Sequence, residues 1–415
     1  MAMALTVWRQ DVGRFARQYL VYFLPITFLV YLTLESYQID FRSFYLAGKS
    51  VLLGLDPYLN YVGMRPEFYG PINSETAPYS GFRYPPFAAL MFAPLALLPY
   101  ATAKAIFTLT MLLSLGLLSF GLVRRSRFAI PGEALLFMIV SFPVLALVER
   151  GQVDSVLVYL IVLAYWASQR RHGTWITALL IALAGVFKIF PLVSLVFYAV
   201  RRQWRLVAGT LLWAAGLVLI PYIYFGNEVY RHFLQRTVPA YFGPITTDLP
   251  MDRHGQGVTL NKVVISMDAD NLIATHDFVN GFMNPLLSNN TLGSLISGTV
   301  LTLLLLIALH HCPVDFQFYG LLNAINLFKP VAWIMGLVWY IPLFLYLYPR
   351  MTRLGQVLLL LPLFLPPFLN ASAVAAYVFT LVFALAHRWP PWGGHLLIPA
   401  QDNPASVAQK PALLP

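Results

Sequence analysis

The sequence has 415 residues, of which 59% are hydrophobic and 11% charged, against roughly 45–50% apolar and 25% charged in soluble domains. This composition excludes an ordinary soluble protein and predicts an all-α, polytopic membrane protein, with residues 1–415 as a single integral membrane domain. The net charge of +10 does not indicate nucleic-acid binding. The basic residues cluster in short tracts between apolar runs, which is the pattern that sets membrane orientation.

The first apolar run, roughly Tyr19 to Glu35, predicts a membrane span. Arg9, Arg14 and Arg17 precede it and place the N-terminus in the cytoplasm. No small-residue cleavage site follows the run, so we expect an anchor rather than a cleaved signal. The loop over residues 36–84 is then external.

Within that loop, an aromatic-rich stretch predicts a helix lying on the membrane surface. The spacing places one set of side chains on an apolar face: Phe41, Phe44, Tyr45, Gly48 and Leu52. Arg42, Ser43 and Lys49 fall elsewhere. Asp40 stands where the chain leaves the bilayer, and it suits either a helix cap or a catalytic carboxylate. Gly54 and Pro57 end the helix.

The next apolar runs alternate with basic tracts. Because the arginines at 124–127 mark a cytoplasmic turn, residues 87–98 are expected to dip into the membrane without crossing it. The predicted spans that follow are Ala101 to Val123, Phe128 to Val148 and Val156 to Ala167.

The run from Thr174 to Val200 is interrupted by FKIFP and has basic residues on both flanks, which predicts a helical hairpin with Lys188 at its bend. An ionisable residue in such a place indicates function. The alternative is a lysine whose ammonium reaches out to the interface.

The remainder predicts a further span at Leu206 to Tyr224, a second large external segment over residues 226–290 and five more apolar runs. These runs are Leu292 to Ala308, Phe318 to Leu327, Val331 to Leu347, Val357 to Leu369 and Ala371 to Ala386. Several are shorter than the ~20 residues of a perpendicular span. We expect 11–12 transmembrane helices in all, and a flexible cytoplasmic tail at residues 387–415.

This topology brings the acids, amides and non-topological bases to the external side. An acid at that surface can take a proton from a hydroxyl, and cations opposite it can hold a phosphate and stabilise its charge as it leaves. The pattern favours group transfer from a lipid phosphate. The aromatic residues Tyr58 and Tyr84 lie where a sugar or prenyl chain could rest.

His310, His311 and Cys312 form a run of metal-ligating residue types. Because adjacent residues point in different directions on a helix, an interfacial cluster explains them better than a metal site. No metal and no cofactor are expected.

Several motifs, in this order, resemble the GT-C superfamily of integral membrane glycosyltransferases, and in particular the family 87 polyprenol-phosphate-mannose-dependent mannosyltransferases. They are DFRSFYLAGKSVLLGLDPY, FRYPPFAALMFAPLALLP, ERGQVDSVLVYLIVLAYWA, ALLIALAGVFKIFPLVSLVFYAVRRQWR, HGQGVTLNK and KPVAW.

The resemblance implies inverting transfer of a sugar from a polyprenyl-phosphate-linked donor to a lipid-linked or cell-envelope glycan acceptor, on the outer face of the cytoplasmic membrane. Asp40 maps onto the general base of such enzymes. The donor phosphate is assigned to Lys188, Arg83, His254 and Lys329. Substrate-binding positions are Asp56, Tyr58, Tyr84, Gly151, Gln152, Asp154, Gln256 and Asn261. The family often has a histidine where Ile334 follows Trp333. If that histidine contacts the donor phosphate or the acceptor, either His254, Lys329 or an arginine such as Arg83 takes its place, or the donor and acceptor differ.

Two other classes stay open from the sequence: a transporter or flippase of lipid-linked sugars, and a subunit that binds the lipid carrier without activity. A transporter would usually carry polar groups near the middle of spans and repeated halves, and neither is evident. Membrane lipids are partners in every case.

Overall fold

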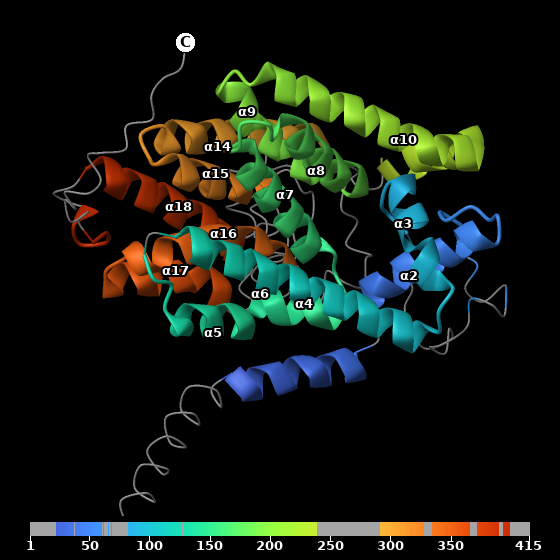
Figure 1. The fold of residues 1–415 in the computed structure, drawn as a ribbon, viewed down its shortest axis with the longest axis horizontal. Coiled ribbons are helices and arrows are strands. Elements are labelled where there is room, and N and C mark those ends of the chain that lie inside the picture. Colours follow the sequence, from blue (N-terminus) through green and yellow to red (C-terminus); the bar gives the residue numbers. More distant parts are fainter. Residues whose placement is uncertain are drawn as a thin grey trace, which may run out of the picture.

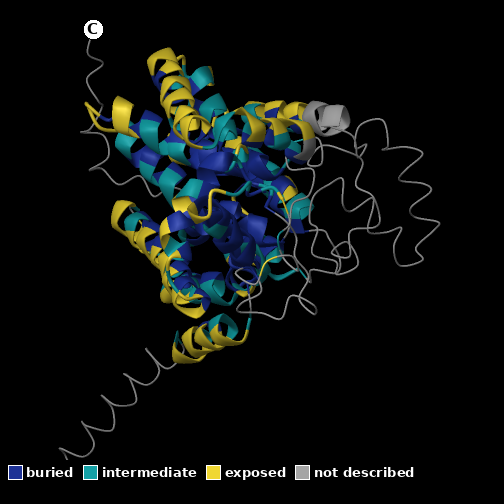
Figure 2. Cartoon of the chain, turned by 90° about the vertical axis from the view of Figure 1, so that its right-hand side faces the viewer, coloured by how far each residue is buried: buried dark blue, intermediate teal, exposed yellow. Residues whose placement is uncertain are grey.

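The computed structural model describes residues 22–36, 38–59, 61, 65, 68, 82–126, 128–238, 291–327, 334–365, 372–389 and 393–398. Within these ranges the predicted all-helical fold is confirmed, and an isolated bridge joins Met351 to Leu397. Several long helices run side by side in a bundle (Figure 1). Buried residues fill its centre, and exposed residues lie on the outer helices (Figure 2).

The first apolar run forms the helix Tyr22–Glu35. The Tyr22 hydroxyl donates to the Gly132 carbonyl at 2.8 Å, and the Lys104 ammonium donates to the Ser36 carbonyl at 2.8 Å. The helix is therefore attached to the bundle near both of its ends. Its outward apolar side chains, such as Leu24, are exposed and suit contact with lipid.

Helix α2, Ile39–Leu52, packs closely against α3, Pro86–Ala96. A Cβ atom at Gly48 would lie 2.6 Å from the carbonyl oxygen of Phe92, so only glycine permits this approach. The one-sided burial predicted for α2 is wrong, because Arg42 is only 1% exposed. The periodicity of one helix does not show that neighbours cover its second face.

Helix α4, Tyr100–Arg125, confirms the span predicted at Ala101 to Val123. The short α3 before it covers most of residues 87–98, and the expectation that this segment dips into the membrane without crossing it stays a prediction. Pro99 separates the two helices, since it has no backbone N–H to continue the hydrogen-bond ladder of α3.

The prediction of one unbroken span from Phe128 to Val148 is wrong, because this segment forms two helices. Helix α5, Gly132–Val140, and helix α6, Phe142–Arg150, are bent by 47° at Ser141. Pro143 stands in the first turn of α6 and lacks the N–H that would continue the ladder of α5.

The predicted hairpin around Lys188 is confirmed. Helix α7, Asp154–Ser168, precedes α8, Thr174–Phe187, which ends where Lys188 adopts an extended backbone. The chain then returns through η2, Phe190–Ser194, and α9, Leu195–Val200. Leu192 of η2 packs directly on Gly185 of α8, where a Cβ would lie 2.3 Å from the leucine side chain.

Helix α10, Trp204–His232, runs along one side of the bundle (Figure 1). Gly226 breaks it with a φ of +73°, and the Tyr230 hydroxyl donates to the Val218 carbonyl at 2.7 Å. These residues are twelve positions apart, so the segment after Gly226 folds back toward the preceding helix. It continues into the π-helix η3, Phe233–Thr237.

The C-terminal part alternates short helices with 3₁₀ segments, and this replaces the unbroken runs predicted at Phe318 to Leu327 and Val331 to Leu347. Its elements are α14 Thr291–Leu309, α15 Val314–Leu321, η5 Leu322–Leu327, η6 Ile334–Tyr340, α16 Ile341–Leu347, η7 Tyr348–Arg350, α17 Arg353–Phe364 and α18 Ser372–Arg388.

By length and composition, two of the described helices can cross a membrane, α4 and Trp204–Gln235, or three if the bent pair α5 and α6 is one span. Eight shorter apolar helices accompany them in the described ranges. The protein is thus a membrane protein rich in apolar helices, while the number of 11–12 crossings stays a prediction.

One end of the bundle is basic. Arg125 lies 4.9 Å from the ring of Trp166, Arg350 lies 4.6 Å from the ring of Phe128, and Arg353 lies 3.5 Å from Glu133. The bent pair α5 and α6 starts beside Glu133 at this basic end and finishes at Arg150. Helix α7 has Trp166 near the basic end and begins at Asp154. Arg150 and Asp154 therefore lie at the end of the bundle opposite the basic turns.

Candidate active site

Asp40 lies in the first turn of α2 and forms a buried ion pair. Its Oδ2 accepts from Nε of Arg150, the last residue of α6, at 2.9 Å. The side chains are 13% and 9% exposed. The helix-cap interpretation of Asp40 is wrong, since Gln38 occupies the cap position and no side chain bonds there. Oδ1 of Asp40 has no hydrogen bond to any described residue and can accept one from a ligand.

Gln38, just before α2, and Gly151, just after α6, determine how closely the two helices that carry this ion pair approach each other. The Gln38 side-chain amide donates to the Val148 carbonyl at 2.7 Å and to the Thr108 hydroxyl at 2.9 Å. Its backbone has a φ of +53°, a conformation that a non-glycine residue keeps only when its surroundings impose it. Gly151 also has a positive φ, +70°, and a Cβ there would lie 2.7 Å from that of Phe41.

Lys188 forms the second buried ion pair of the site. Its ammonium donates to Oδ2 of Asp154 at 2.7 Å, and Oδ1 of Asp154 accepts from the indole N–H of Trp339 at 2.9 Å. Asp154 is the first residue of α7, where the free N–H groups of a helix favour a negative charge. Its side chain is 3% exposed and that of Lys188 14%.

Tyr84 lies beside the Lys188 pair and near the charges of the Asp40 pair. Its hydroxyl lies 3.1 Å from the amide nitrogen of Gln152, its backbone carbonyl accepts from the Tyr58 hydroxyl at 2.7 Å, and its ring lies 5.7 Å from the Lys188 ammonium. Burial, and then the charges of Asp40 and Asp154, raise the pKa of Tyr84 well above its usual value. The phenol therefore stays protonated and can donate a hydrogen bond.

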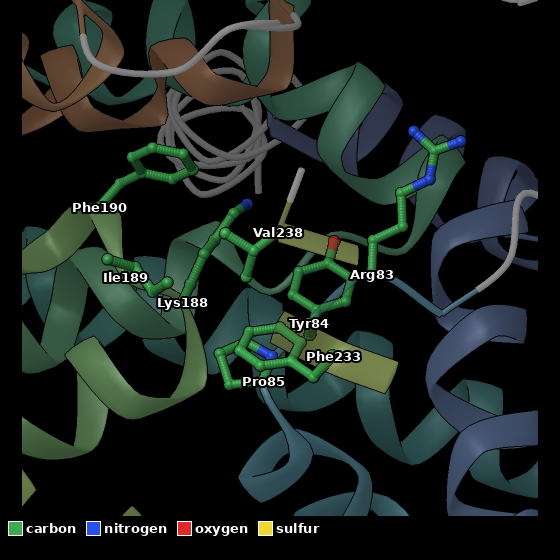
Figure 3. Close-up of a pocket in the computed structure, with 8 residues that line it drawn as sticks. All are labelled: Arg83, Tyr84, Pro85, Lys188, Ile189, Phe190, Phe233 and Val238. Atoms are coloured by element: carbon green, nitrogen blue, oxygen red, sulfur yellow. The ribbon is translucent and has the colours of Figure 1, made fainter. Parts of the chain in front are cut away.

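A pocket opens beside Tyr84 and Lys188, with about 380 Å³ of empty space including its open mouth. Apolar side chains from η2, η3 and the segment before α3 surround these polar groups (Figure 3). The lining residues are Arg83, Tyr84, Pro85, Lys188, Ile189, Phe190, Phe233 and Val238. Arg83 is one of these lining residues, and it forms no ion pair with any described residue.

A further contact holds the segment after Gly226 over this region. His232 contacts the carboxylate of Asp56 through Nδ1, and Asp56 also accepts from the backbone N–H of Tyr58 at 2.8 Å. The ring of Tyr58 lies 5.7 Å from that of Phe233, which lines the pocket. The loop after α2 and the end of α10 thus meet beside the pocket.

The structure brings together most of the residues predicted from the sequence. Asp40, Gly151, Gln152, Tyr84, Asp154, Lys188 and Arg83 lie in one connected region, with Asp56 and Tyr58 at its edge. His254, Gln256, Asn261 and Lys329 lie outside the described residues. Sequence reasoning did not find Gln38, His232 or Trp339, and it did not find the pairing of Arg150 with Asp40.

The run His310 to Cys312 lies apart from this region. Cys312 is buried, its sulfur lies 3.8 Å from the Ala384 carbonyl oxygen, and the two histidine rings contact each other at 4.9 Å. Burial raises the pKa of the Cys312 thiol to about 12. Among the described residues no group of three His, Cys, Asp or Glu side chains could hold a metal ion.

An apolar helical bundle with two ion pairs and a pocket at one end defines a polytopic membrane protein with a candidate active site at a bundle end. The sequence model of Glycosyltransferase family 87 matches residues 82–312, more than half of the chain. The chain therefore belongs to glycosyltransferase family 87.

Two curated relatives are polyprenol-phosphate-mannose-dependent alpha-(1-2)-phosphatidylinositol pentamannoside mannosyltransferases. The protein of Mycolicibacterium smegmatis is 28% identical over 183 residues, which are 42% of this chain and 43% of the relative. The protein of Mycobacterium tuberculosis is 26% identical over 281 residues, 64% of this chain and 58% of the relative. The matches thus span less than two thirds of either relative. No solved structure matches the chain.

Proposed function

We propose that this protein is a membrane glycosyltransferase that transfers a sugar, mannose or a similar hexose or pentose, from a polyprenyl phosphate to a lipid-linked or cell-envelope glycan. The observation that carries the proposal is the convergence of the Asp40–Arg150 and Lys188–Asp154 pairs around Tyr84, beside an apolar pocket. Family membership and the donor named for both relatives support the donor class.

In the proposed mechanism Asp40 is the general base. Its Oδ1 accepts the proton of an acceptor hydroxyl, while Arg150 holds Oδ2 and stabilises the carboxylate. The hydroxyl oxygen forms a bond to the anomeric carbon, and the bond from that carbon to the donor phosphate oxygen breaks. Attack opposite the leaving group inverts the anomeric configuration.

The cations suit the departing phosphate. A polyprenyl phosphate gains one negative charge when the sugar leaves, and charge stabilisation that grows during the reaction lowers the barrier. Lys188 is already paired with Asp154, so it contributes oriented N–H donors. Arg83 also lines the pocket and forms no ion pair with any described residue. The apolar side chains of the pocket suit the prenyl chain.

We place the site on the outer face of the cytoplasmic membrane. It lies at the end of the bundle opposite Arg125, Arg350 and Arg353, and basic turns favour the cytoplasmic side.

The test is a transfer assay with purified protein in detergent, using polyprenyl-phosphate-mannose and a membrane glycolipid extract, with products identified by mass spectrometry. Asp40→Asn should lower the rate at least 100-fold, as loss of a general base does. Asp315→Asn is the matched control, because Asp315 bonds the Tyr165 hydroxyl away from the site. A flippase or a binding subunit would give no product even with the wild-type protein.

A further inference from the structure

The buried indole of Trp339 lies 185 positions along the chain from Asp154, and the resemblance to known glycosyltransferases assigns it no role. We infer that Trp339 is a positioning residue: its N–H fixes the carboxylate of Asp154, which in turn holds the Lys188 ammonium toward the donor phosphate. This inference rests on the proposed function and deepens it. It also changes the role predicted for Asp154 from substrate binding to orientation of Lys188.

The burial of Asp154 carries the first step. Its side chain is only 3% exposed, and each of its oxygens already accepts from a neighbour, Lys188 at 2.7 Å and Trp339 at 2.9 Å. A carboxylate enclosed in this way does not reach a substrate. A bond from a neutral donor to a buried carboxylate is stronger than one between neutral groups, so Trp339 restricts which way the carboxylate faces.

The second step concerns Lys188. A lysine side chain is flexible and loses considerable rotamer entropy when it binds a ligand. Here the backbone of Lys188 leaves α8 in an extended conformation, and Asp154 occupies one of its three N–H donors. The two other donors are then directed by the position of Oδ2. Figure 3 shows the lysine among the side chains that line the pocket.

The third step is the rigidity of the support. Trp339 is fully buried in η6, which packs against α6 and α7. These two helices carry Arg150 and Asp154. The same packing therefore sets the distance between the Asp40 pair and the Lys188 pair, and a catalytic arrangement of this kind depends on such orientation.

The chain offers a matched control. Trp166 is also buried, and its indole N–H donates to the Tyr319 hydroxyl at 3.1 Å near the other end of α7. Trp339→Phe and Trp166→Phe remove the same chemical group from two buried sites. Only the first change alters the carboxylate that holds Lys188.

The experiment measures binding and transfer in both variants. We expect Trp339→Phe to weaken binding of farnesyl phosphate, a soluble polyprenyl phosphate, about tenfold, as befits a hydrogen bond to a charged group. The KM for the sugar donor should rise by a similar factor, with the acceptor KM unchanged. Trp166→Phe should leave both quantities within about twofold of wild type, because its partner is neutral and remote.

A double variant separates positioning from general packing. In Lys188→Gln, the additional Trp339→Phe change should have no further effect on farnesyl phosphate binding, since Trp339 acts through the lysine. Additive effects, or equal losses in the two tryptophan variants, would overturn the inference. Because binding is measured without sugar transfer, a wild-type protein that binds farnesyl phosphate but forms no product would contradict the proposed function and leave this inference standing.

Discussion

Gly151 offers a sharp test of how the candidate site is held together. It ends α6 next to Arg150, has a φ of +70°, and faces α2 one residue from Asp40. Gly54 is its natural comparison, because it follows the C-cap of α2 with a φ of +65° and a Cβ there would meet nothing within 4 Å. Alanine at either position adopts the same unfavourable backbone, but only at 151 does it also collide.

The expected magnitudes follow from these contacts. A left-handed alanine costs about 1–2 kcal/mol of stability, which is the whole effect expected for Gly54→Ala. At Gly151 the new Cβ would lie 2.7 Å from the Cβ of Phe41 and 2.9 Å from that of Gln38, and neither atom can rotate away. Overpacking of this kind costs a further ~1–3 kcal/mol. Carbon atoms prefer about 3.5–4.0 Å, so α2 and α6 must separate by roughly 1 Å.

That separation lies directly across the bond from Arg150 to Asp40, which is 2.9 Å long. A shift of about 1 Å at a catalytic group can lower the rate about 100-fold. Thermal unfolding in detergent and the mannosyl transfer rate are the two measurements. The reasoning fails if Gly151→Ala keeps the stability and the rate of Gly54→Ala, because both glycines have a positive φ but a Cβ would collide with neighbours only at Gly151.

The sequence predicted the parts of the fold that depend on local pattern. The span at α4 and the hairpin that places Lys188 at its bend both follow from apolar runs and the basic tracts beside them. The break at Ser141 had a local signal as well, because Pro143 cannot continue the ladder of a helix. Its meaning was hidden by the length of the apolar run.

The partners of the site residues could not be predicted, because they come from distant parts of the chain. Asp40 and Arg150 are 110 positions apart, and Asp154 and Trp339 are 185 apart. Asp40 in the first turn of a helix also has the pattern of a cap, and only the position of α6 shows that its carboxylate pairs with an arginine. The burial of Arg42 has the same origin, since the periodicity of α2 alone does not show which other parts of the chain pack on it.

Two more predictions concern the walls of the pocket. Lys188→Met should raise the KM for the donor at least tenfold and leave the KM for the acceptor nearly unchanged. Steady-state kinetics with each substrate varied in turn measures both constants. An effect confined to the acceptor KM would show that Lys188 does not bind the donor phosphate. His232→Leu should raise the donor KM a few-fold, because it removes the buried contact with Asp56 that holds the end of α10 beside the pocket. Glu228→Ala, which breaks the exposed pair with Arg231 on the same segment, should change it little, since exposed pairs contribute about 0–1 kcal/mol. If both variants have the same donor KM, the contact of His232 does not hold the pocket wall.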